Sequence, residues 1–192
     1  MSDTLSAAFE SQAAFRALMD ALARPGEIRR LPAVNAPAPL MPATAAIVRS
    51  LADYETPVWL DTSFAEQAAA VDWIRFHTGA PMTRNAEGAG FALVADTGAM
   101  PPFAAFAQGD AEYPDRSTTI IAQMESFDGD AFTLAGPGIK TEYVVTLGAL
   151  PHDFSERWAE NRALFPRGID LVLVAGEDVI ALPRTVRVSR KA

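Results

Sequence analysis

The spacing of hydrophobic residues changes along the chain between a helical period and a strand period. Residues 11–24 follow the helical period, with apolar side chains at Phe15, Leu18, Met19 and Leu22. The Pro25-Gly26 pair that follows predicts the end of this helix. By contrast, Ile169–Val174 is apolar on both faces, which is the pattern of a central strand covered on both sides.

The same reasoning predicts the other elements. Further helices are expected at 43–52, from a capping box at Ser63–Glu66 to about Gly79, and from Asp153 or Ser155 to about Phe165. Strands are expected at 27–31, 58–61, 91–96, 118–124, 132–134 and 143–146, and as a tightly turned pair within 169–183. The stretch between 97 and 116 predicts a loop with one turn of helix at 102–107.

Helices that alternate with strands favour an α/β fold, here a three-layer α/β/α arrangement with a mixed sheet. The 192 residues suffice for one domain with its own core, so 1–192 is expected to be a single domain. Four prolines between 32 and 42 predict irregular, extended chain that would join an N-terminal arm, 1–42, to the main body. The sequence has neither a signal-peptide pattern nor a membrane-length apolar run, so a cytoplasmic location is expected.

The composition narrows the chemistry that this chain can perform. The sequence has no cysteine, which excludes disulfides, thiolate nucleophiles and cysteine-held clusters or zinc. The two histidines, His77 and His152, are too few for a multi-histidine site, so no metal is expected. A net charge of −8 argues against nucleic acid and membranes as partners. Because the sixteen basic residues include only two lysines, Lys140 and Lys191, a bound anion would be held mainly by arginines.

Two short motifs carry candidate ligand-binding groups, and each also has a structural explanation. The GPGIK stretch contains Gly136 and Gly138, whose backbone N–H groups could face an anion or could simply form a turn between strands. The RFHT stretch places Arg75 and His77 near a helix C-terminus, where they either contact a ligand or interact with the helix dipole. No GxSxG motif marks a hydrolase nucleophile, and the catalytic residues stay unknown.

A carboxylate interrupts the most hydrophobic strand of the sequence. Asp170 lies in this apolar run, and a buried carboxylate must be paired or hydrogen-bonded. Arg184 follows the second strand of the same hairpin, so its guanidinium can meet that carboxylate through two hydrogen bonds. The pair is either an internal salt bridge that fixes the hairpin or the border of an anion pocket or subunit contact.

Six segments that span nearly the whole chain form a set that is more specific than any one of them. They are FRALMDALARPGEI at 15–28, TPVWLD at 56–61, RFHTGAP at 75–81, GPGI at 136–139, FPRGIDLVL at 165–173 and ALPRT at 181–185. In this order and spacing, the set resembles the PhnH family, the H subunit of the carbon–phosphorus lyase core complex.

The resemblance implies a role in the bacterial use of alkylphosphonates. It implies that the chain acts with the G, I and J subunits, and with the L subunit, when a phosphonate displaces adenine from ATP to give ribose 1-phosphonate 5-triphosphate. The I subunit would carry the nucleosidase-like chemistry, and the J subunit would cleave the carbon–phosphorus bond with a radical and an iron–sulfur cluster. The resemblance further implies a homodimer in isolation and a fold like a trimmed large domain of pyridoxal-phosphate-dependent transferases, with no cofactor.

Two functions stay open at this point, and a third has less support. The chain is either a structural and regulatory subunit or a subunit that itself binds nucleotide or phosphonate. The second function requires converging arginines, and the arginines in or beside the family-like segments are Arg16, Arg75, Arg167 and Arg184. The third, a free-standing transferase of pyridoxal-type fold, would need Lys140 or Lys191 as its cofactor lysine, and the sequence gives neither a buried context.

Overall fold

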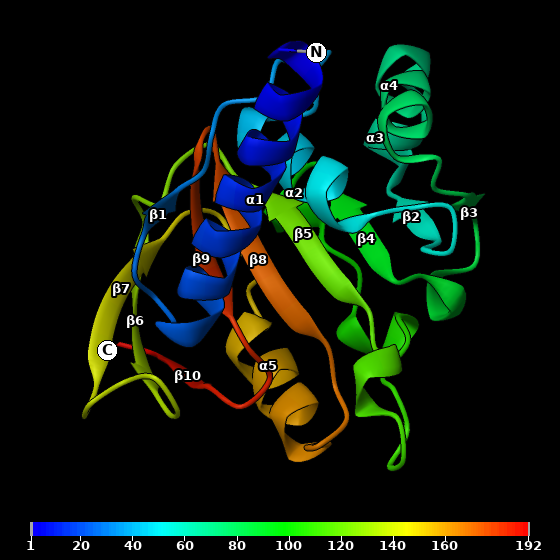
Figure 1. Cartoon of the computed structure of the whole chain (residues 1–192). Helices are drawn as coiled ribbons and strands as arrows, with labels where there is room; N and C mark the ends of the chain where they lie inside the picture. The colour runs from blue at the N-terminus through cyan, green and yellow to red at the C-terminus, as the bar shows by residue number, and fades with distance from the viewer. Residues whose placement is uncertain (1, 192) are drawn as a thin grey trace.

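The computed structural model describes residues 2–191 and contains two β-sheets with helices packed against them (Figure 1). The main sheet has seven strands in the order β1-β9-β8-β5-β4-β2-β3. These strands are β1 Arg29–Arg30, β2 Val58–Leu60, β3 Met82–Thr83, β4 Phe91–Val94, β5 Thr119–Gln123, β8 Asp170–Ala175 and β9 Asp178–Leu182. The second sheet is antiparallel, in the order β10-β6-β7, with β6 Asp130–Ala135, β7 Tyr143–Leu147 and β10 Arg187–Arg190.

The direction of the strands confirms an α/β fold with a mixed sheet. Strands β3, β2, β4, β5 and β8 are mutually parallel, whereas β9 runs antiparallel to both β8 and β1. Leu171 and Val172 are fully buried in β8, which lies between β5 and β9. The expectation that this apolar run forms an interior strand is therefore confirmed.

The helices divide unequally between the two faces of the main sheet. They are α1 Ser2–Ala23, α2 Pro42–Leu51, α3 Thr62–Ala65, α4 Ala68–Thr78 and α5 Phe154–Ala163, with 3₁₀ turns at Ala86–Gly88, Thr97–Ala99, Phe103–Ala105 and Pro114–Arg116. One core joins α1, α2, α3 and α4 to sheet residues such as Ile121 and Val172. The other joins α5 and the small sheet to the alternate residues Ile120 and Leu171, because successive strand side chains point to opposite faces.

The second outer layer corrects the expected α/β/α arrangement. Between β5 and β8 the chain builds the β6–β7 hairpin and α5, and β10 adds its strand at the end of the chain. This layer is therefore one helix beside a three-stranded sheet, with 3₁₀ turns at its rim (Figure 1). The physical reason is that Phe132, Leu134 and Val145 bury their side chains against the main sheet, as a second layer of helices would.

The first helix is longer than predicted and presents a different face to the core. It starts at Ser2, and its buried side chains are Ala14, Leu18 and Ala21. Phe15 and Met19, which the apolar stripe places inside, are 46% and 37% exposed. Small alanine side chains let α1 pack closely against α2 and β9, which turns the larger apolar side chains outward.

The predicted capping box at Ser63 is wrong. Asp61 caps α3 instead, accepting a hydrogen bond from the backbone N–H of Phe64 at 2.9 Å. The expected single helix is also divided in two, because α3 ends at Ala65 and α4 starts at Ala68. The cap moved to Asp61 because this residue directly follows β2 and its second oxygen accepts from the N–H of Ala95 at 2.7 Å.

The proline-containing segment is irregular, as predicted, but it is held against the sheet. Gln123, at the end of β5, is 2% exposed and accepts from the backbone N–H of Met41 at 2.8 Å. Its amide nitrogen donates to the carbonyl of Pro39 at 2.8 Å. The segment therefore packs on the main body. Within residues 2–191, no helix combines the length and the hydropathy needed to cross a bilayer.

Candidate functional site

Asp170 and Arg184 meet, as the predicted hairpin requires. Asp170 begins β8, and Arg184 comes two residues after the end of β9. The guanidinium donates from Nη2 to Oδ2 at 2.5 Å and from Nε to Oδ1 at 3.2 Å. The backbone N–H of Arg184 adds a 2.8 Å bond to the same Oδ1. Both side chains are largely buried, with 13% of the arginine and 23% of the aspartate exposed.

The remaining donors of Arg184 bind other parts of the protein. Nη1 donates to the carbonyls of Pro114 at 2.9 Å and Pro166 at 3.3 Å, and Nη2 donates to the hydroxyl of Ser117 at 2.6 Å. A guanidinium has five N–H donors, so every donor of Arg184 has an acceptor inside the protein. Because every donor is filled, Arg184 forms an internal salt bridge that ties three loops together. This saturation argues against an anion pocket at this residue.

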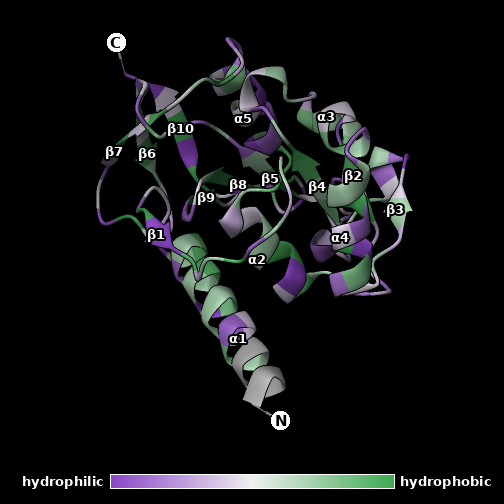
Figure 2. Cartoon of the chain, turned by 90° about the horizontal axis from the view of Figure 1, so that it is seen from above, coloured by the Kyte–Doolittle hydropathy of each residue, from purple (hydrophilic) through white to green (hydrophobic). Residues whose placement is uncertain are grey.

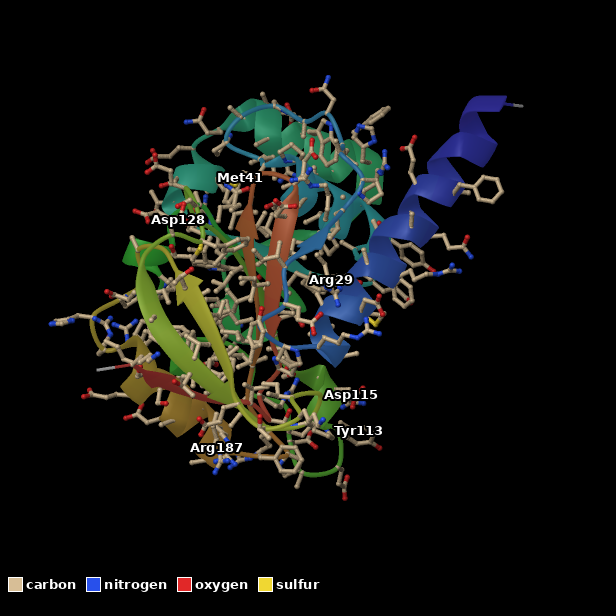
Figure 3. All side chains as sticks on the ribbon, turned by 90° about the vertical axis from the view of Figure 1, so that its left-hand side faces the viewer. Arg29, Met41, Tyr113, Asp115, Asp128 and Arg187 are labelled. Atoms are coloured by element: carbon tan, nitrogen blue, oxygen red, sulfur yellow. The ribbon has the colours of Figure 1, made fainter. Side chains whose placement is uncertain are left out.

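The Arg184 cluster also lies at the edge of the sheet that is less suited to ligands. Asp170 pairs with Thr119 in the register of β8 and β5, so the cluster lies where these parallel strands begin. Open α/β sheets bind their ligands beyond the carboxyl ends of the strands. Figure 3 shows the two ends: Tyr113 and Asp115, which flank Pro114, lie opposite Met41, which contacts the carboxyl end of β5.

At the carboxyl edge, the chain changes direction between β2 and β4. Strand β2 leads through α3 and α4 to β3 on one side, whereas β4 leads to β5 on the other. Asp61 spans this gap through its bonds to the N–H groups of Phe64 and Ala95. Asp96 lies just after β4 and accepts from the N–H of Gly98 at 2.8 Å. Two carboxylates at this switch point disfavour an anion there.

A cavity of about 440 Å3 lies next to this gap, where β2 and β3 end beneath α3 and α4. Arg75 projects into its lining from α4, and Arg84 joins it from just after β3. Neither guanidinium has an ion pair or hydrogen bond with any residue between 2 and 191. The lining also includes Thr62 and Thr83, and it contains no aspartate or glutamate. Sequence reasoning found Arg75 but missed Arg84, because it predicted no strand at 82–83 and so gave no reason to place Arg84 at the end of one.

The other polar residues singled out in the sequence lie elsewhere. His77 is exposed on α4 and packs between the rings of Trp73, at 4.3 Å, and Phe76, at 5.0 Å. Arg16 is exposed on α1, and Arg167 is exposed in the turn before β8. The structure therefore does not bring the four candidate arginines to one site, because Arg184 and Arg75 lie at opposite edges of the sheet.

The glycines of the GPGIK stretch form the β6–β7 turn, which packs on the end of α1. Gly136 and Gly138 have positive φ angles of 148° and 82°. A Cβ at Gly138 would lie 2.3 Å from the carbonyl oxygen of Ala23, so the close approach requires glycine. The C-terminal end of a helix carries negative partial charge, which disfavours an anion beside this turn. Lys140 is exposed in the same turn.

No group of three or more histidine, aspartate or glutamate side chains in the described part of the chain is placed to hold a metal ion. The two arginine sites thus belong to an α/β protein, one site with the carboxylate of Asp170 and the other with no carboxylate in its lining. A family model described as bacterial phosphonate metabolism protein (PhnH) matches residues 4–189. The chain belongs to this family.

Individual relatives agree with the family match. The chain is 47% identical over 185 residues to a protein of Rhizobium meliloti (strain 1021), and the match covers 95% of this chain and 92% of the relative. That relative is named alpha-D-ribose 1-methylphosphonate 5-triphosphate synthase subunit PhnH. This chain is also 34% identical, over 84 residues that make up 43% of each protein, to the putative C-P lyase subunit protein HtxG of Stutzerimonas stutzeri. The family inferred from the six sequence segments is therefore confirmed.

Proposed function

We propose that this chain is the H subunit of a carbon–phosphorus lyase assembly that degrades alkylphosphonates. In that assembly it supports the formation of ribose 1-phosphonate 5-triphosphate from ATP and a phosphonate. The observation that carries this proposal is the 47% identity, over 95% of the chain, to a relative named as a subunit of the corresponding synthase. The second relative, named as a putative C-P lyase subunit, supports the same assembly.

Within the assembly, we place the catalytic centre on another subunit. Displacement of adenine from a ribose carbon benefits from a group that can donate a proton to the leaving base. The cavity beside α4 is lined by guanidinium groups, hydroxyls and apolar side chains, and Arg184 is fully bonded within the protein. These groups suit binding and positioning better than proton transfer, because arginine stays protonated.

The exposed apolar face of α1 is the surface that we assign to partner subunits. Phe15 and Met19 lie one turn apart on this helix, and Phe9 is 68% exposed nearer its start. Figure 2 shows α1 running outward from the sheet, with hydrophobic bands along it. An apolar face of this kind costs solvation free energy until it is covered. We propose that it contacts a second copy in an isolated homodimer, and the G, I or J subunit in the cytoplasmic assembly.

Co-purification and growth test this proposal together. The tagged chain, co-expressed with the G, I and J subunits, is expected to bring them down, and a strain without it is expected not to grow on methylphosphonate. Phe15→Glu should weaken association, whereas Gln12→Glu places the same charge on an exposed position of the same helix as a control. Normal growth of the deletion strain, with no subunit recovered by the wild-type chain, would contradict the proposal.

The alternative of a free-standing transferase with a pyridoxal-type fold is less well supported. Lys140 and Lys191 are both exposed, whereas a Schiff-base lysine needs a desolvated surrounding to lower its pKa. Treatment of the chain with pyridoxal phosphate and borohydride should therefore leave no stoichiometric adduct. An adduct that disappears in Lys140→Ala would instead support the transferase.

A further inference from the structure

We propose that the cavity between Arg75 and Arg84 is a binding site for a small anion that carries a tetrahedral phosphoryl or phosphonyl group. Neither the family match nor the names of the relatives assign any residue or ligand to this cavity. The proposal rests on the function above only for the physiological identity of the ligand. Binding itself follows from the groups that line the cavity.

The charge of the lining is the first argument. The chain carries a net charge of −8, yet this cavity presents two guanidinium groups and no carboxylate. Two cations that line one cavity repel each other. An anion bound between them is attracted to both, and this attraction offsets the repulsion. The cavity of about 430 Å3 between α5 and β10 differs, because Glu142 shares its lining with Arg162 and Arg187. Arg187 is the first residue of β10, and Figure 3 shows it on the opposite part of the fold from Met41.

The unused hydrogen-bond donors are the second argument. Arg184 shows how this fold treats a guanidinium that stabilises it, since all its donors are bonded. Arg75 and Arg84 are exposed and have no such bonds within residues 2–191, so their planar forks face solvent at the cavity and are open to a ligand. An arginine fork matches two oxygens of a phosphoryl group, and charge-assisted bonds of this kind are the stronger ones. Thr62 lines the same cavity and carries a hydroxyl group that can donate a further hydrogen bond.

The place and shape of the cavity are the third argument. It lies beyond the carboxyl ends of parallel strands β2 and β3, the edge at which open α/β sheets bind ligands. The neighbouring gap between β2 and β4 is filled by Asp61, so an anion is directed to the arginine side. An apolar part of the lining is formed by Leu60, Val71 and Met82. The cavity volume of about 440 Å3 leaves room for an alkyl or polyphosphate substituent beyond one tetrahedral group.

Calorimetric titration of the full chain at constant ionic strength tests the site. The probes are inorganic phosphate, methylphosphonate and tripolyphosphate, and the variants are Arg75→Gln, Arg84→Gln and the double variant. Each single variant should weaken binding at least about tenfold, as expected for the loss of charge-assisted bonds, and the double variant should abolish it. Arg187→Gln is the matched control and should bind as the wild type does. Circular dichroism should show that every variant is folded.

The ranking of the probes identifies the source of the tetrahedral group. Tighter binding of tripolyphosphate assigns the site to a polyphosphate chain, and tighter binding of methylphosphonate assigns it to a phosphonate. The proposal is overturned if no probe binds, if the double variant binds like the wild type, or if Arg187→Gln loses binding equally. The titration uses this chain alone. Its result therefore does not depend on whether the chain assembles with other subunits in the co-purification experiment.

Discussion

Arg184 and Arg75 are residues of the same type that lie at opposite edges of one sheet. Their guanidinium groups differ in what surrounds them. Arg184 gives all its donors to Asp170, Ser117 and the carbonyls of two proline residues. Arg75 shares a cavity with Arg84 and has no bonded acceptor within residues 2–191. The contrast teaches that an arginine in a family-like segment can serve the fold, with its donors filled by the protein, or can lie in a cavity with its donors open to a ligand.

Of the substitutions that test this comparison, the removal of Arg184 should lower the free energy of unfolding the most. Arg184→Ala leaves the partly buried carboxylate of Asp170 without its cation and removes the link between three loops. We expect the free energy of unfolding to fall by about 3 kcal/mol, as when one partner of a buried pair is removed. Arg75→Ala should change it by less than about 0.5 kcal/mol, as at ordinary surface positions. Urea denaturation measures both values.

The same variant separates the two roles considered for the Asp170–Arg184 pair. If the pair only fixes the hairpin, Arg184→Ala is less stable but still joins the assembly at a temperature where it is folded. If the pair borders a subunit contact, the folded variant fails to co-purify. A loss of less than about 1 kcal/mol, with normal growth on methylphosphonate, would remove support for both roles.

The β6–β7 turn provides the next largest effect. Gly138→Ala introduces a Cβ 2.3 Å from the carbonyl oxygen of Ala23 at a positive φ, so we expect a loss of about 2–3 kcal/mol in the absence of any ligand. Gly176→Ala is the matched control, because Gly176 has a φ of 64° but nothing within 4 Å of the new Cβ. Its loss should be about 1 kcal/mol, the cost of the backbone conformation alone. Equal losses in the two variants would show that the contact with α1 is unimportant.

The ion pair between Arg30 and Asp178 should have the smallest effect. Arg30 donates to Asp178 at 2.8 and 2.9 Å, and this bond holds the pKa of the carboxyl below its ordinary value of 3.8. Because the pKa is lowered on folding, the charged carboxylate stabilises the folded state above pH 3.8. This stabilisation is lost as the pH falls through the pKa of the folded state. Because the arginine side chain is 70% exposed, Asp178→Asn should cost no more than about 1 kcal/mol at pH 7.

Thermal denaturation between pH 2 and pH 7 measures the size and the sign of this effect. The difference in melting temperature between Asp178→Asn and the wild type should disappear toward the acid end, because both side chains are then uncharged. A difference that grows as the pH falls would contradict the assigned direction of the pKa shift.

The sequence by itself determined the elements whose causes are local, together with the family. The two-sided apolarity of the β8 region predicted an interior strand, and the hairpin that follows it predicted that Asp170 and Arg184 would meet. Both depend on residues within about one hairpin of each other, so their geometry follows from strand pairing alone. The six family-like segments agreed with the family match over residues 4–189.

The tertiary structure decided the features that depend on distant parts of the chain. Pro114 and Ser117 became acceptors of Arg184 because the loop before β5 ends beside the start of β8. The outward position of Phe15 follows from how closely α1 approaches α2, and hydrophobic spacing alone does not contain that distance. Arg84 joined Arg75 because β3 pairs with β2 beneath α4. The physical reason is common to all three: a side chain's partners are set by packing between elements, whereas spacing along the chain sets only the elements themselves.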